Sequence, residues 1–133
     1  MEKRTWLILM FFLFIILNAC AFDIVRVKQI PVSFESYHNP KILLELQEET
    51  KVDLGTGYCR TLKSKTRWEY VGKISYGEVF KTKDQILTVE ASNIYEAYIV
   101  ISGGELVGFY LPVEKSFTPL SKSKLLNMKK IVS

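Results

Sequence analysis

Along most of the chain, apolar and polar residues alternate in short runs. The runs are rich in β-branched and aromatic residues, and Gly, Pro, Asn, Asp or Ser stands between them. This pattern predicts strands separated by turns. The predicted strands cover residues 22–30, 66–74, 78–82, 86–90, 95–102, 105–111 and 117–120. So many short strands at regular spacing predict a mainly β fold, a small antiparallel sheet, sandwich or barrel.

Two local signals sharpen this prediction. Gly103-Gly104 joins two of the predicted strands, 95–102 and 105–111, which indicates a hairpin whose turn requires positive φ angles. Pro31 follows the first predicted strand. Because proline has no backbone N–H, it ends that strand or places it at a sheet edge.

Residues 41–50 are predicted to form one short helix that covers a face or an open end of the sheet. Asn39-Pro40 suits an N-cap followed by proline at the first helical position. Apolar residues follow at helical spacing, with glutamates on the opposite side. However, Ile42, Leu44 and Leu46 also alternate, so a strand remains the alternative.

The N-terminal residues have the composition of an export signal. Lys3 and Arg4 are followed by an uninterrupted apolar run, residues 6–17. As a helix this run would be about 18 Å long, well short of the roughly 30 Å hydrocarbon core of a bilayer. Its length and its charged start therefore favour a signal peptide over a spanning helix.

The residues after this run, Leu17-Asn18-Ala19-Cys20, resemble the bacterial lipobox. In that motif an aliphatic residue at −3 and a small residue at −1 precede the modified cysteine; Asn18 departs from the usual residue at −2. The resemblance implies cleavage before Cys20, a diacylglyceryl thioether on its sulfur and acylation of the new amino terminus. In Gram-negative lipoproteins, a residue such as Ala21 in place of an aspartate after the cysteine implies the outer membrane, facing the periplasm.

Two alternatives remain open for the same residues. Ala19-Cys20-Ala21 is also a site of the kind that ordinary signal peptidase cuts, which would leave a soluble chain beginning at Phe22. The apolar run could also stay uncleaved as a short anchor. With the lipobox, the chain divides into a signal peptide (1–19), a strand, loop and short helix (20–54), an antiparallel β domain (55–120) and a basic, mobile or loosely helical tail (121–133).

Composition and charge limit the functional classes. A chain of 133 residues fits one small domain, and its formal charge of +4 is spread along the sequence. The lysines and arginines do not form the concentrated basic face of a nucleic-acid-binding protein. A loose resemblance to bacterial SH3-like barrels rests on a tryptophan strand that leads through a glycine turn (Trp68, Gly72, Ile74, Gly77, Val79); it implies no ligand site.

The residues that could carry chemistry are isolated. His38 is the only histidine, and no nearby ligand set predicts a metal site. With Cys20 lipidated, Cys59 is a lone thiol, which we interpret as a buried structural cysteine rather than a nucleophile paired with His38. Gly55-Thr56-Gly57 lacks the following lysine of a phosphate loop. We therefore predict no catalytic residue, no metal and no cofactor.

Aromatic residues are the most suggestive feature of the predicted strands. Phe109 and Tyr110 are consecutive and must face opposite sides of a sheet, and Tyr98 lies in the preceding strand. Either both faces of the sheet are covered, or an aromatic patch is exposed for recognition. The candidate recognition surface is therefore Phe109, Tyr110 and Tyr98, centred on residues 108–112.

Three hypotheses for function follow. The first is a non-enzymatic lipoprotein, held on the membrane by Cys20, that acts as an adaptor or accessory of an envelope assembly and binds an envelope protein. The second is a periplasmic binding module for a small apolar ligand or for cell-wall glycan, which predicts a concave aromatic-lined site. The third is an enzyme, which would need His38 or Cys59 beside a partner in a cleft.

Overall fold

The computed structural model describes residues 27–39, 41–55, 59–91 and 93–131, and within these ranges the chain forms strands and no helix. The mainly β, antiparallel prediction is confirmed. The strands are β1 (Ile30–Pro31), β2 (Glu35–Ser36), β3 (Leu43–Leu46), β4 (Thr50–Asp53), β5 (Cys59–Leu62), β6 (Arg67–Ile74), β7 (Gly77–Thr82), β8 (Thr88–Glu90), β9 (Ile94–Glu96), β10 (Tyr98–Ser102), β11 (Glu105–Leu111), β12 (Ser116–Leu125) and β13 (Met128–Ile131).

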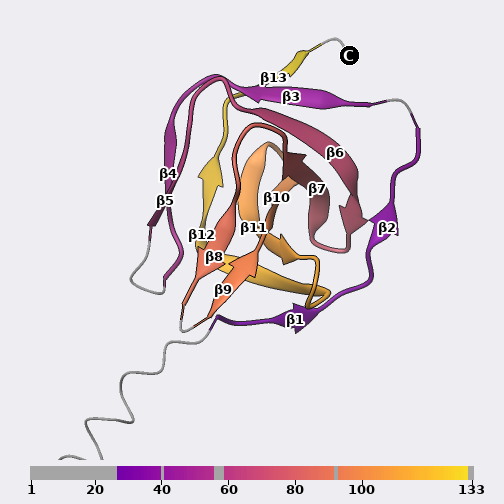
Figure 1. Cartoon of the computed structure of the whole chain (residues 1–133), viewed down its shortest axis with the longest axis vertical. Coiled ribbons are helices and arrows are strands. Elements are labelled where there is room, and N and C mark those ends of the chain that lie inside the picture. The colour runs from indigo at the N-terminus through magenta and orange to yellow at the C-terminus, as the bar shows by residue number, and fades with distance from the viewer. Residues whose placement is uncertain (1–26, 40, 56–58, 92, 132–133) are drawn as a thin grey trace, which may run out of the picture.

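The main sheet is antiparallel and curves round on itself (Figure 1). Its order is β1-β12-β11-β10-β7-β6-β3-β13, and β2 adds to β6. The chain itself connects β12, the second strand in this order, directly with β13, the last one. Leu125 of β12 pairs with β11, and three residues later Met128 of β13 pairs with Leu46 of β3. Seven strands therefore form a ring that the continuous segment from β12 to β13 closes; in order they are β12, β11, β10, β7, β6, β3 and β13.

Two short ribbons lie beside this ring, β4 with β5 and β8 with β9. Arg60 of β5 connects them: its Nε donates to the carbonyl oxygen of Thr88 at 2.8 Å, and its guanidinium also pairs with the Glu90 carboxylate. Because both acceptors lie on β8, one side chain fixes the position of one ribbon against the other.

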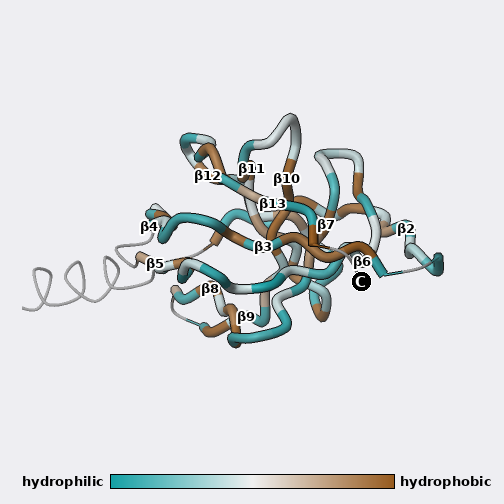
Figure 2. The backbone as a smooth tube through the Cα atoms, turned by 90° about the horizontal axis from the view of Figure 1, so that it is seen from above, coloured by the Kyte–Doolittle hydropathy of each residue, from teal (hydrophilic) through white to brown (hydrophobic). Residues whose placement is uncertain are grey.

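The main core lies between one face of the main sheet and the two ribbons, because Val52, Leu62 and Val89 of the ribbons belong to it. Figure 2 shows hydrophobic segments in the middle of the molecule, at β3, β6 and β10. Trp68 is fully buried there, and its indole Nε1 donates to Thr66 Oγ1 at 3.0 Å, which satisfies its only polar group. The buried members are Leu46, Val52, Leu62, Trp68, Phe80, Leu87, Val89, Ala97, Ile99, Ile101, Leu106, Phe109, Leu111 and Leu126.

A second, smaller core covers the outer face of the sheet. Ile74, Val79, Val100, Tyr110 and Phe117 form it. The N-terminal segment, through Ile30, Val32 and Phe34, packs over these residues. Both faces of the sheet are therefore covered. This is the first of the two alternatives that the sequence left open for the aromatic residues.

This close packing depends on Gly72 of β6. A Cβ atom at Gly72 would lie 2.3 Å from the carbonyl oxygen of Glu35 and 2.6 Å from the ring of Phe34. Only a residue without a side chain allows β2 and Phe34 to approach β6 this closely.

The predicted helix over residues 41–50 is wrong. Leu43–Leu46 is the strand β3, paired with β6 on one side and β13 on the other, and Thr50–Asp53 is β4. The alternation of Leu44 and Leu46, both of which pack on the main core, was the relevant period. The local pattern is compatible with a helix or a strand. Pairing with β6 and β13 gives this segment the strand conformation.

The C-terminal segment also differs from the prediction. Residues 121–131, expected to be mobile or loosely helical, contain the end of β12 and all of β13. The predicted strand 95–102 is divided at Ala97 between two sheets, β9 and β10. The Gly103-Gly104 hairpin is confirmed, with φ angles of 60° and 80°. Of the predicted strand 22–30, residues 22–26 lie outside the described residues, 27–29 are not in a strand, and only Ile30 belongs to a strand, the edge strand β1.

Candidate functional site

The predicted recognition residues do not form a common surface. Phe109 is 1% exposed in the main core, and Tyr110 is 5% exposed on the opposite face of β11. Tyr98 of β10 is half-buried and lies on the same face as Tyr110, with ring centroids 6.3 Å apart. Of the two alternatives for these aromatic residues, the covered sheet therefore holds, and Phe109 and Tyr110 do not form an exposed patch.

Phe34 is the reason that Tyr110 is covered. The two rings are stacked, with centroids 5.0 Å apart and an interplanar angle of 13°. Burial, and to a lesser degree the neighbouring Tyr98, raises the pKa of the Tyr110 hydroxyl. Phe34 was not among the predicted recognition residues; the signal that could have identified it is the alternation of Val32 and Phe34 with Ser33 and Glu35.

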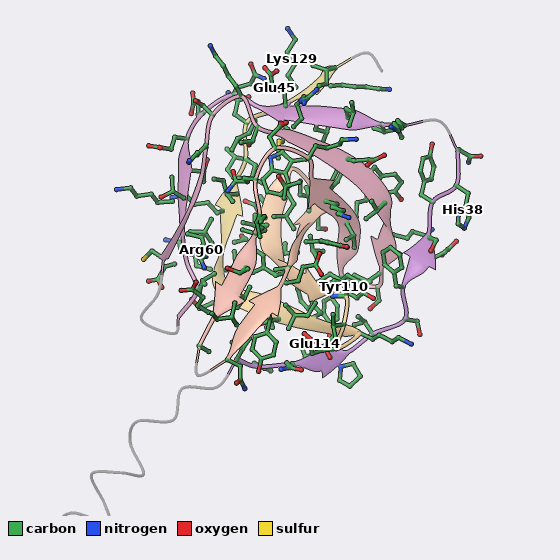
Figure 3. The ribbon with its side chains drawn as sticks, viewed as in Figure 1. His38, Glu45, Arg60, Tyr110, Glu114 and Lys129 are labelled. Carbon is green, nitrogen blue, oxygen red and sulfur yellow. The ribbon has the colours of Figure 1, made fainter. Side chains whose placement is uncertain are left out.

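The structure does not bring His38 and Cys59 together. His38 is exposed on the segment after β2, whereas β5, which carries Cys59, lies at the opposite side of the molecule (Figure 3). Cys59 is exposed, so its interpretation as a buried cysteine is wrong. Among the residues that the structure describes, no group of three or more His, Cys, Asp or Glu residues could hold a metal ion.

Three other predicted residues, Leu17, Ala19 and Cys20, lie outside the described residues, as does the whole predicted signal peptide. In the part of the chain that the structure covers, no helix has the length and apolar character needed to cross a bilayer.

Tyr98 remains as a candidate because it borders a surface groove. The groove has a volume of about 470 Å³ and is lined by residues 81–87, which run from the end of β7 to the start of β8, and by Glu96, Ala97 and Tyr98. The Lys81 Nζ atom lies 5.6 Å from the centroid of the Tyr98 ring, within the range of a cation–π contact. We call this feature the Tyr98 groove.

One wall of the Tyr98 groove is held by an ion pair. Asp84 accepts hydrogen bonds from the backbone N–H of Arg67 at 2.7 Å and from its guanidinium at 2.8 and 3.1 Å. The side-chain bond to Arg67 is the main cause that lowers the pKa of Asp84, and the same bond raises the pKa of Arg67. The pair fixes the loop after β7 to the start of β6.

The loop also contains an unsatisfied polar atom. The backbone N–H of Gln85 donates to Thr82 Oγ1 at 3.2 Å, but its side-chain Oε1 is buried and has no hydrogen-bond partner among the residues that the structure describes. Chemically, the groove offers ammonium, carboxylate and amide groups beside one aromatic ring. Such a lining suits the binding of a polar ligand that carries hydroxyl groups.

Comparisons with known proteins provide no relative for this chain. No protein-family model matches it, and searches of curated proteins and of solved structures found no significant match.

Proposed function

We propose that this protein is a lipid-anchored lipoprotein of the bacterial cell envelope whose β domain acts as a non-enzymatic adaptor or accessory. The observation that carries this proposal is the order of features at the N-terminus: positive charge, a short apolar run and Leu17-Asn18-Ala19-Cys20. On this reading, the acyl chains on Cys20 hold the domain at the membrane, because each buried CH₂ contributes about 0.8 kcal/mol. The preferred site in a Gram-negative cell is the periplasmic side of the outer membrane.

The start of the described domain is consistent with a short tether. Val27 already packs against the main core. Only six residues lie between it and Cys20, and the seven Cα–Cα steps from Cys20 to Val27 span at most about 25 Å. A lipid on Cys20 would therefore keep the β domain close to the bilayer surface, where an adaptor meets the partners that share its membrane.

Membrane fractionation of cells that express the protein tests the anchor. We expect the wild-type chain to remain with the membranes after washes with high salt and at high pH, which remove proteins held only by charge. Cys20→Ser should leave the membrane fraction after cleavage or accumulate as uncleaved precursor. The matched control is Cys59→Ser, which removes the other cysteine and should fractionate like the wild type. If Cys20→Ser and Cys59→Ser behave alike, the lipoprotein proposal fails.

The Tyr98 groove favours a second candidate function, a periplasmic binding module for cell-wall glycan. An aromatic ring beside several polar side chains suits a sugar better than it suits a small apolar ligand. Soluble cell-wall fragments should shift the amide resonances of residues 81–87, and Tyr98→Ala should abolish the shifts. Tyr76→Ala, at a tyrosine that does not line this groove, is the control. Equal loss of binding in both variants would reject the groove as the glycan site.

A further inference from the structure

The second half of β12 leaves the regular strand ladder. Gly108 of β11 pairs with Pro119, but Leu106, two residues earlier in β11, pairs with Lys124. Residues 120–123 therefore stand opposite Val107 alone, without strand partners in β11. An insertion of extra residues of this kind is a β-bulge, and bulges redirect side chains and backbone groups away from the sheet.

These extra residues build one side of a groove. They are Leu120-Ser121-Lys122-Ser123, and together with Lys124 they face residues 51–53 of β4 across a space of about 370 Å³. Leu120 packs on the main core and Val52 is buried, so both are fixed at the base. The serines and lysines of the bulge are exposed. We call this feature the β12 groove.

The charges in the β12 groove are unbalanced. Three lysines (Lys51, Lys122 and Lys124) and one carboxylate (Asp53) line it. The four ion pairs of the described residues involve Arg60, Arg67, Lys73 and Lys83, so none of the three lysines of the groove is paired.

The carboxylates near the groove are already engaged in hydrogen bonds. Asp53 Oδ1 accepts from the backbone N–H of Gly55 at 2.8 Å, and Glu105 Oε2 accepts from the Ser123 hydroxyl at 3.1 Å. The ammonium groups thus face solvent beside the free hydroxyl of Ser121. Several cations and hydroxyls around one concave space match an oxyanion with several oxygens.

We propose that the β12 groove binds the phosphate group of a phosphate ester. Lysine binds phosphate as a point charge, and a bulge offers backbone N–H groups that are not committed to a strand partner. The volume leaves room for a small alcohol or sugar attached to the phosphate. The ester could be free or part of a lipid headgroup. This inference does not depend on Cys20, so it stands or falls separately from the lipoprotein proposal.

Two triple variants of the full chain provide a charge-matched test. Lys51→Gln with Lys122→Gln and Lys124→Gln removes the three cations of the groove. Lys63→Gln with Lys129→Gln and Lys130→Gln removes three exposed cations that do not line it, so both variants have the same net charge. All six side chains are exposed, and circular dichroism should show the same fold for both.

The first measurement is a titration of the ¹⁵N-labelled chain in non-ionic detergent with glycerol 1-phosphate. Saturable shifts are expected at Ser121, Lys122 and Ser123. Each exposed cation contributes a factor of about two to five to binding, so the groove variant should bind about ten- to a hundredfold more weakly, and the control less than about twofold. Asp53→Asn, which removes the one carboxylate among the described residues of the lining, should tighten binding by about two- to fivefold.

The second measurement identifies the source of the phosphate. Co-sedimentation compares vesicles of phosphatidylglycerol with vesicles of phosphatidylcholine. The apolar N-terminus binds both kinds of vesicle, so it does not contribute to the difference between them. Saturable glycerol 1-phosphate binding that only the groove variant loses supports a free ester. A preference for phosphatidylglycerol that only the groove variant loses supports a lipid headgroup. If the groove variant and the control behave alike in both measurements, the β12 groove is not a phosphate site.

Discussion

Removing the ring of Phe34 should weaken the fold and change the titration of a tyrosine on the covered face. Phe34 is half-buried and stacks on Tyr110. Together with Ile30 and Val32 it packs over the second, smaller core. Truncating a fully buried phenylalanine to alanine costs about 3–5 kcal/mol. Because part of the Phe34 ring reaches solvent, we expect Phe34→Ala to lower the free energy of unfolding by about half of that, roughly 2 kcal/mol.

The second effect of Phe34→Ala concerns the hydroxyl of Tyr110. Burial raises its pKa above the value of an unfolded tyrosine, about 10. A group with a raised folded-state pKa stabilises the fold below its unfolded pKa, and this contribution is lost as the pH rises through the folded pKa. Phe34→Ala should move the pKa of Tyr110 down toward 10 and so weaken the loss of stability at alkaline pH.

Two assays measure these effects. Urea unfolding followed by circular dichroism should show a midpoint lower by about 1 M for Phe34→Ala, because the free energy of unfolding of a small domain falls by about 2 kcal/mol per M urea. ¹³Cζ resonances of tyrosine report the pKa of Tyr110 directly, with Tyr110→Phe for assignment. Phe34→Leu, which keeps an apolar side chain, is the control and should lose less than half as much stability. Unchanged stability together with an unchanged Tyr110 pKa in Phe34→Ala would refute the claim that this segment covers the outer face.

Three further predictions test other contacts. Gly72→Ala should destabilise the protein by about 1–3 kcal/mol, because the new Cβ would meet the Glu35 carbonyl oxygen at 2.3 Å; thermal unfolding measures this, and a neutral effect would contradict the close approach of β2. Arg60→Met should increase amide hydrogen exchange in β8 and β9 by about tenfold and leave β10 unchanged; uniform exchange would show that Arg60 does not hold the ribbon. The lowered pKa of Asp84 means that its stabilisation is present above the unfolded pKa of about 3.9 and is lost as the pH falls through the lower folded value. The stability difference between wild type and Asp84→Asn should therefore shrink between pH 6 and pH 2, and a constant difference would refute this.

The parts of the fold that local chemistry determines were predictable from the sequence. Gly103-Gly104 requires positive φ whatever surrounds it, and the consecutive Phe109 and Tyr110 face opposite sides of any strand. The strand Leu43–Leu46 was predicted only as the alternative to a helix, because its conformation depends on β6 and β13, which lie elsewhere along the chain. Local periodicity over so short a segment is compatible with helix and strand.

The exposure of the candidate recognition residues could not be predicted for a related reason. Whether Tyr110 is exposed depends on Phe34, a residue in a different part of the sequence, and no pattern within residues 105–111 reports that contact. The β12 groove could not be predicted from the sequence either, because a serine- and lysine-rich segment is typical of a solvated tail. Only the shift in register between β11 and β12 shows that these residues form a bulge facing β4.

Intact mass spectrometry of the protein purified from bacterial membranes tests whether Cys20 carries a lipid. We expect a chain that begins at Cys20 and carries the additional mass of a diacylglyceryl group and an amide-linked acyl chain. Digestion should assign all of that mass to the peptide that contains Cys20. A soluble chain that begins at Phe22, or an intact chain without added mass, would refute the lipid anchor.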